Sequence, residues 1–189
     1  MKLTLATHNL HKRDELIAIV GNSFEVDILP DDFPEIPETG ATLRENALIK
    51  ARSVHHVLGG AVLSDDTGLE VEALGGQPGV FTARYAGENA TYHDNCNKLL
   101  NELDGVTNRK ARFSTVIAFI DEKGTESTFM GSVEGSITEE FRGASGFGYD
   151  PVFEPIESDG LTFAEMSSSQ KNQISHRARA MAAFLASVA

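Results

Sequence analysis

Residues 61–69 read AVLSDDTGL, an apolar run that ends in two adjacent carboxylates. The run follows two glycines and has the length of a buried strand. Successive side chains of a strand point to opposite faces, so Asp65 and Asp66 face apart if the extended backbone continues. Only one carboxylate then faces a given ligand, and the other is free to brace the backbone or a neighbour.

Two interpretations of this acidic pair stand side by side. Asp and Gly are common turn residues, so Asp-Asp-Thr-Gly is compatible with a solvated turn at the end of the strand. Clustered carboxylates repel one another unless a cation lies nearby, which makes a metal site the alternative. The pair alone does not separate the two interpretations.

Composition narrows the class of protein. The 189 residues are 41% hydrophobic, enough for a core, and we expect residues 1–189 to form one domain. A net charge of -12 argues against nucleic acid or an anionic membrane as partner, because both need a basic face. No segment is long enough to cross a bilayer and no apolar leader is visible, so we expect a soluble cytoplasmic protein. Cys96 is alone, which excludes an internal disulfide and a Cys-based zinc cluster.

Charge is distributed unevenly along the chain. Residues 14–43 contain eight acidic residues and no Lys or Arg, whereas residues 171–189 contain Lys171, Arg177 and Arg179 and no acid. This separation suits an anionic ligand that carries a divalent cation. A solvated acidic loop is the simpler explanation of the acidic part taken alone.

Hydrophobic periodicity predicts alternating strands and helices. Besides the run that ends at the carboxylates, we expect strands at residues 2–6, 24–29, 69–73, 111–120 and 125–133, the last two as a hairpin. We expect helices after Asn9, at 43–58 and at 91–103. A last helix is expected to start with a capping box at Ser167 and to continue along an apolar stripe at 174, 178, 181, 185 and 188.

The turn after the first strand carries Thr7, His8 and Asn9, and Lys12 lies in the first turn of the next helix. A strand, a polar turn and a helix point free backbone N–H groups and a helix dipole at an anion. A plain Asn N-cap explains the same residues, since the Gly-x-x-x-x-Gly-Lys pattern of a P-loop is missing.

The acidic loop at residues 30–40 leads into Thr42 and Glu45, which form a capping box for the next helix. Glu45 therefore has a structural role. Glu38 lies outside the helix without such a role, and we select it as the candidate second metal ligand.

Two further segments carry candidate ligand contacts. In the glycine-rich loop 143–151, Phe147 and Tyr149 offer flat surfaces for stacking on a base and Asp150 can accept from a ring N–H, with a tight turn and core aromatics as the alternative. Near the start of the last helix lie Lys171, His176 and Arg177, where the dipole disfavours positive charge. Left uncompensated, they suit an anion or a carbonyl oxygen; solvated surface residues are the alternative.

Six motifs in one order along the chain together resemble the inosine triphosphate pyrophosphatase family, although none is specific alone. They are Thr7-x-Asn9-x-x-Lys12, Thr39-Gly40-x-Thr42-x-x-Glu45-Asn46-Ala47, Ser64-Asp65-Asp66-Thr67-Gly68-Leu69, Pro78-Gly79-Val80-x-x-Ala83-Arg84-Tyr85, Gly146-Phe147-Gly148-Tyr149-Asp150-Pro151 and Lys171-x-x-x-Ser175-His176-Arg177.

The resemblance implies an α/β fold with an elongated, twisted mixed sheet flanked by helices, two lobes with a substrate cleft between them, and a homodimer. It implies magnesium-dependent hydrolysis of inosine, deoxyinosine and xanthosine triphosphates to the monophosphate and pyrophosphate. Carried onto this sequence, Asp66 is the base and a metal ligand, Glu38 helps to hold the metal, and Lys12 is catalytic. The implied substrate contacts are Thr7, His8, Asn9 and Lys12 for the phosphates, Thr67 and Lys171, and Phe147, Gly148, Tyr149, Asp150, His176 and Arg177 for the base.

The sequence departs from the family pattern at two positions. His8 stands where Gly is usual, which is unfavourable if that turn needs a positive φ. Thr67 replaces the commoner Ser and keeps the hydroxyl. Three questions stay open: whether Asp65 or Asp66 takes the proton, whether the enzyme prefers another modified base, and whether the protein is a nucleotide sensor without catalysis.

Overall fold

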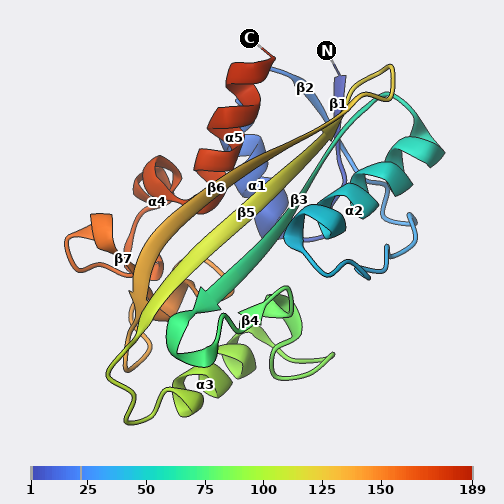
Figure 1. The fold of residues 1–189 in the computed structure, drawn as a ribbon. Coiled ribbons are helices and arrows are strands. Elements are labelled where there is room, and N and C mark those ends of the chain that lie inside the picture. The colour runs from blue at the N-terminus through green and yellow to red at the C-terminus, as the bar shows by residue number, and fades with distance from the viewer. Residues whose placement is uncertain (1, 22, 189) are drawn as a thin grey trace. The chain divides into compact units, whose positions relative to one another are not determined.

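The computed structural model describes residues 2–21 and 23–188, and within them a seven-stranded sheet is accompanied by helices (Figure 1). The strands are β1 Lys2–Leu5, β2 Glu25–Ile28, β3 Ala61–Val71, β4 Pro78–Gly79, β5 Lys110–Ile120, β6 Glu126–Ile137 and β7 Phe153–Pro155. The α-helices are α1 Leu10–Val20, α2 Leu43–Leu58, α3 Tyr92–Glu102, α4 Ser168–Ile174 and α5 His176–Ser187. Short 3-10 helices span Glu72–Leu74, Thr82–Arg84, Asp150–Val152, Ile156–Ser158 and Phe163–Glu165.

The sheet is mixed, as predicted. Its strand order is β2-β1-β3-β5-β6-β7, with β4 paired to β3. Strand β1 is parallel to both β2 and β3, whereas the β3–β4 and β6–β7 pairs are antiparallel. The expected hairpin of β5 and β6 turns at residues 121–124, where Asp121 Oδ1 accepts hydrogen bonds from the backbone N–H groups of Lys123 and Thr125.

The chain divides into two compact units. The first contains the chain up to Asp66, Thr115–Gly131 and the chain from Arg177 onward; the second contains Thr67–Ser114 and Ser132–His176. Strands β3, β5 and β6 contribute residues to both units. The predicted pair of lobes with a substrate cleft between them stays a prediction.

In the first unit the alternation of strand residues fills a core on each face of the sheet. Leu63 belongs to a buried cluster that includes Leu16 of α1 and Met181 of α5. Its neighbour Val62 belongs to another cluster, which includes Ala51 of α2. Helices α1 and α5 therefore cover one face and α2 covers the other.

The second unit has a core of its own, rich in aromatic rings. Phe113 of β5 lies with its ring centroid 4.7 Å from that of Phe153, in an edge-to-face arrangement. Leu99 and Cys96 of α3 belong to the same buried cluster. Cys96 is therefore a packed residue of this core.

The prediction that the apolar run ends at the two aspartates, with a separate strand at 69–73, is wrong. Strand β3 runs without interruption through both aspartates to Val71, so the turn interpretation is excluded. The turn preference of Asp and Gly is a local propensity, and tertiary contacts override it here. The neighbouring strands and the contacts of both carboxylates hold the backbone extended.

The last predicted helix is in fact two helices. The Ser167–Gln170 capping box starts α4 as expected, but Ser175 adopts an extended backbone (φ -66°, ψ 154°) and α5 begins at His176. The predicted apolar stripe holds at Met181, whereas Val188 is exposed. Among the described residues, no helix is long and apolar enough to span a membrane.

Candidate active site

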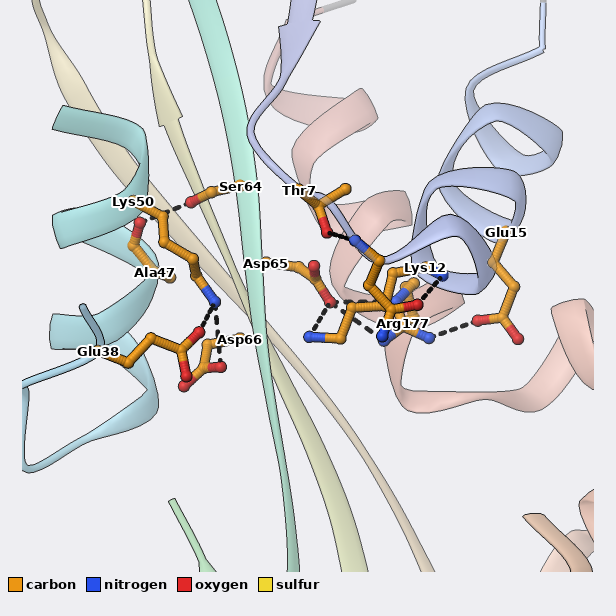
Figure 2. Close-up of polar contacts among 11 residues, drawn as sticks. Thr7, Lys12, Glu15, Glu38, Ala47, Lys50, Ser64, Asp65, Asp66 and Arg177 are labelled. Atoms are coloured by element: carbon orange, nitrogen blue, oxygen red, sulfur yellow. Dashed lines mark hydrogen bonds and ion pairs between the residues drawn. The ribbon is translucent and has the colours of Figure 1, made fainter. Parts of the chain in front are cut away.

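Asp65 and Asp66 point to opposite faces of the sheet, as the strand period requires (Figure 2). Asp65 faces α1 and α5, and Asp66 faces α2. Ser64, which precedes them, donates to the Ala47 carbonyl oxygen of α2 at 2.6 Å and ties β3 to that helix. Both carboxylates belong to the first unit.

The Asp65 side is a closed network of charges. Arg177 donates to Asp65 Oδ2 through Nε at 3.2 Å and through Nη2 at 3.1 Å. Lys12 Nζ lies 3.4 Å from the same oxygen, and Arg177 Nη1 also donates to Glu15 of α1. Arg177 is only 1% exposed. Two cations thus meet two carboxylates on this side of β3.

This network fixes the ionisation of its members. Burial alone would raise the pKa of Asp65, but Lys12 and Arg177 together hold that pKa well below its ordinary value. Burial lowers the pKa of Lys12, and Asp65 opposes that shift. Asp65 is therefore a persistent anion, which makes it a poor acceptor for a proton.

The Asp66 side carries fewer cations. Lys50 of α2 places Nζ 3.2 Å from Asp66 Oδ1 and 2.5 Å from Glu38 Oε1. Asp66 is 6% exposed, and within the described chain its buried Oδ2 has no hydrogen-bond partner. The three groups together carry one net negative charge. Burial raises the pKa of Asp66, although Lys50 opposes the shift.

Glu38 is held near α2 by the end of the acidic loop. The Gly40 backbone N–H donates to Asn46 Oδ1 at 2.7 Å. The Ala41 and Thr42 N–H groups donate to Glu45 Oε2, which confirms the capping role of Glu45. A Cβ on Gly40 would lie 2.6 Å from the Glu45 Cβ, so this close approach needs glycine.

The Asp66 side fits a magnesium ion. Glu38 and Asp66 already reach one cationic nitrogen, and Asp66 Oδ2 is buried with an unused lone pair. Among the described residues, no group of three or more His, Cys, Asp or Glu forms a ready-made cage. Two carboxylates suit magnesium, which commonly takes its remaining ligands from water and substrate phosphates.

The start of α1 is capped as predicted. Asn9 is the N-cap and its side chain accepts from the Lys12 N–H at 3.2 Å, while Thr7 Oγ1 accepts from the Asn9 N–H. The first turn contains no acidic residue. His8 is exposed and is not among the residues with positive φ, so replacing Gly there causes no backbone strain.

The glycine-rich loop lies in the second unit and is organised by Asp150. Asp150 Oδ2 accepts from the Phe147 N–H at 2.8 Å and from Lys171 Nζ at 2.6 Å. Lys171 Nζ lies 4.8 Å from the centroid of the Phe147 ring. A Cβ on Gly146, whose φ is +77°, would come within 2.1 Å of Asp150 Oδ2. Carboxylates thus pair with both Lys171 and Arg177, so neither charge is uncompensated. Both side chains are buried, so the alternative of solvated surface residues is wrong.

Two predicted base contacts are core residues. Tyr149 is 2% exposed, and its hydroxyl donates to the Thr82 carbonyl oxygen at 3.0 Å. Its ring is thus buried, and the expected stacking surface on Tyr149 is wrong for this structure. The His176 ring stacks on Phe113 with centroids 4.6 Å apart. Phe147 is half-buried and keeps the predicted role open.

Some of the predicted site residues contact one another within the first unit, and others belong to the second unit. Asp66 and Glu38 meet, and Lys12 meets Arg177 through Asp65. Phe147, Gly148, Asp150, Lys171 and His176 belong to the second unit, as does Thr67, which follows Asp66 in β3. Their predicted roles toward the substrate stay predictions.

Sequence reasoning missed Lys50 and Glu15. The signal for Lys50 was its position: it lies on the face of α2 that also carries the buried residues Ala47, Ala51 and Val54. A lysine within an apolar helix face needs a buried anion. The signal for Glu15 was weaker, because an acidic residue in α1 has no evident partner until Arg177 is placed.

Comparison with known proteins identifies the family of this chain. Residues 3–187 match the Ham1 family. A dITP/XTP pyrophosphatase of Thermoanaerobacter sp. is 50% identical, with 96% of this chain and 93% of the relative covered. One of Porphyromonas gingivalis is 51% identical, with 96% and 94% covered. The Staphylococcus aureus Ham1 protein superposes with a TM-score of 0.88 at 38% identity, covering 100% of this chain and 98% of that one. The resemblance seen in the sequence is confirmed, and the chain belongs to the Ham1 family.

Proposed function

We propose that the protein hydrolyses the deaminated purine nucleoside triphosphates ITP, dITP and XTP to the monophosphate and pyrophosphate. Relatives at about half identity over nearly the whole chain carry the name dITP/XTP pyrophosphatase. The observation that carries the proposal is the convergence of Glu38 and Asp66 on one cation, with Asp66 Oδ2 left for a further ligand.

Asp66 and Glu38 would hold magnesium in this proposal. When bound, magnesium supplies positive charge to the phosphate oxygens and acidifies water. Asp66 accepts the proton of the attacking water, a role that the persistently ionised Asp65 fills poorly. Lys12 and the positive end of the α1 dipole bind phosphate oxygens and stabilise the charge that develops as the anhydride bond breaks.

Selectivity rests on the oxygen at purine position 6. The family resemblance assigns recognition of this oxygen to the glycine-rich loop at residues 147–150 and to His176. It also names Arg177, but in this structure the guanidinium of Arg177 donates to Asp65 and Glu15. Adenine presents an amino group at that position, so donor would face donor. A site whose donors lose their acceptor discriminates by roughly 10⁴-fold. Magnesium as the cation and a homodimer are further parts of the proposal that rest on the family resemblance. The cytoplasmic location expected from the sequence is also part of the proposal.

A pyrophosphate-release assay over a panel of triphosphates tests the proposal. We expect magnesium-dependent release of pyrophosphate from ITP and XTP, with at least about 10³-fold lower kcat/KM for ATP. Preference for a modified pyrimidine triphosphate would point to a different base pocket. Nucleotide binding without turnover would indicate a sensor, and orthophosphate as the first product would refute the mechanism.

A further inference from the structure

Lys50 occupies the position between the two carboxylates that the proposed function assigns to magnesium (Figure 2). Its Nζ lies 2.5 Å from Glu38 Oε1 and 3.2 Å from Asp66 Oδ1, and the side chain is 12% exposed. The ammonium group is thus a direct substitute for a bound cation. Without it, two poorly hydrated carboxylates would face one another.

We propose that Lys50 is an internal counter-ion that competes with the divalent cation for Glu38 and Asp66, and that this competition couples metal binding to the arrival of the substrate's phosphates. This inference rests on the proposed function, because it takes the triphosphate as the anion that draws Lys50 away.

The charges give the direction of the effect. Lys50, Glu38 and Asp66 carry one net negative charge, so the protein alone offers a dication little attraction. A cation beside Lys50 is repelled by an ammonium within contact distance of the same carboxylates. A triphosphate supplies several negative charges, which pair with Lys50 and free both carboxylates. Metal and phosphates then bind more tightly together than either does alone, and the coupling acts equally in both directions.

The geometry leaves room for this exchange. Lys50 has a flexible four-carbon side chain on α2, and its ammonium is a point charge that can turn from one oxygen to another without a fixed bidentate geometry. Asp66 Oδ2 has no hydrogen-bond partner in the described chain, so a metal ion gains a ligand there at once. By contrast, Arg177 donates hydrogen bonds to Asp65 from two nitrogens of its planar guanidinium, a geometry that makes exchange for another cation unfavourable.

The first test measures the affinity of the protein for Mn²⁺ and Mg²⁺ in the absence of nucleotide. Calorimetry serves for both ions, and the electron paramagnetic resonance signal of Mn²⁺ reports the free ion. The variants are Lys50→Met and Lys50→Gln. The amide of Lys50→Gln still donates a hydrogen bond, so this variant decides the test if Lys50→Met does not fold. We expect both to bind the metal at least about tenfold more tightly than the natural sequence. Unchanged or weaker binding would overturn the proposal, because it would make Lys50 a supporter of the metal site.

Arg52→Met is the matched control. Arg52 lies on the same helix and pairs with Glu126 at 2.6 Å, away from Glu38 and Asp66. Its removal changes net charge by the same amount, so it separates the local effect of Lys50 from a general one. Equal tightening in both variants would also overturn the proposal.

The second test measures coupling with the α,β-methylene analogue of ITP, which resists hydrolysis at the bond in question. The ratio of analogue affinities with and without Mg²⁺ should be larger for the natural sequence than for Lys50→Met. An equal ratio would overturn the coupling. Failure of the analogue to bind the natural sequence would refute the proposed function instead, while the titration with metal alone would still decide whether Lys50 competes.

Discussion

The neighbouring carboxylates Asp65 and Asp66 lie on opposite sides of β3 and have different ion-pair partners (Figure 2). Two nitrogens of Arg177 and the Nζ of Lys12 all contact one oxygen of Asp65, and Glu15 completes a balanced set of charges. Asp66 shares a single ammonium with Glu38, and its second oxygen has no hydrogen-bond partner in the described chain. The ion pairs of Asp65 hold that carboxylate with two cations, whereas in our proposal Asp66 exchanges its single cation, Lys50, for a metal ion. The two residues are nevertheless adjacent in sequence.

The difference follows from alternation in a strand. Because neighbouring side chains point to opposite faces, two identical residues are placed against different helices without any special loop. Helices α1 and α5 bring arginine and lysine to one face, while α2 and the acidic loop bring one lysine and one glutamate to the other. An acidic pair in a covered strand can therefore divide structural and chemical roles.

The largest expected effect is the loss of activity in Asp66→Asn. Removal of a general base costs roughly 10²–10⁴-fold in kcat, and loss of a metal ligand adds to this. The free energy of unfolding should not fall. Burial raises the pKa of Asp66, so above that pKa the charged carboxylate destabilises the folded state, and the neutral amide of Asn removes this cost. Pyrophosphate release and urea unfolding measure the two quantities. Near-normal turnover would remove Asp66 from the chemistry.

Much of this comparison was accessible from the sequence. Alternation predicted that Asp65 and Asp66 face apart, and the lack of a structural role singled out Glu38, which the structure places beside Asp66 through Lys50. The capping boxes at Thr42 and Ser167 were also predicted, because they depend on residues three positions apart. Local rules sufficed wherever the contact was local.

The parts that sequence reasoning missed depend on distant contacts. Arg177 and Asp65 are 112 positions apart, and no spacing rule joins them. Turn propensity suggested that Asp-Asp-Thr-Gly ends a strand, yet partners from α1, α2 and α5 keep β3 extended through it. Lys50 was overlooked because a lysine on an amphipathic helix usually reaches solvent. Tyr149 was assigned to a ligand, although its ring belongs to the second unit's core.

The second prediction concerns Asp65→Asn, which should mainly reduce stability. The substitution leaves Arg177 and Lys12 with one carboxylate fewer in a buried setting, and breaking such a pair costs about 3–5 kcal/mol. The free energy of unfolding, measured by urea denaturation, should fall by that amount, while Asp66→Asn serves as the isosteric control at the adjacent position. Equal stability of the two variants would abolish the distinction between the closed and the exchangeable side.

The smallest effect is expected at Glu15, at the edge of the closed side. Its side chain is 17% exposed, whereas that of its partner Arg177 is 1% exposed. Glu15→Gln keeps an oxygen that accepts from the guanidinium, and Arg177 retains Asp65, so the free energy of unfolding should fall by only about 1–3 kcal/mol. Glu126→Gln is the matched control, because Glu126 pairs with Arg52 at the surface and should contribute at most about 1 kcal/mol. If both variants lose the same small amount, the contact of Arg177 with Glu15 is worth no more than a surface ion pair, and the closed side reduces to Asp65 and its two cations. A clearly larger loss at Glu15 places α1 within the network, because a carboxylate from α1 and one from β3 then both hold Arg177, while Lys12 of the same helix contacts Asp65.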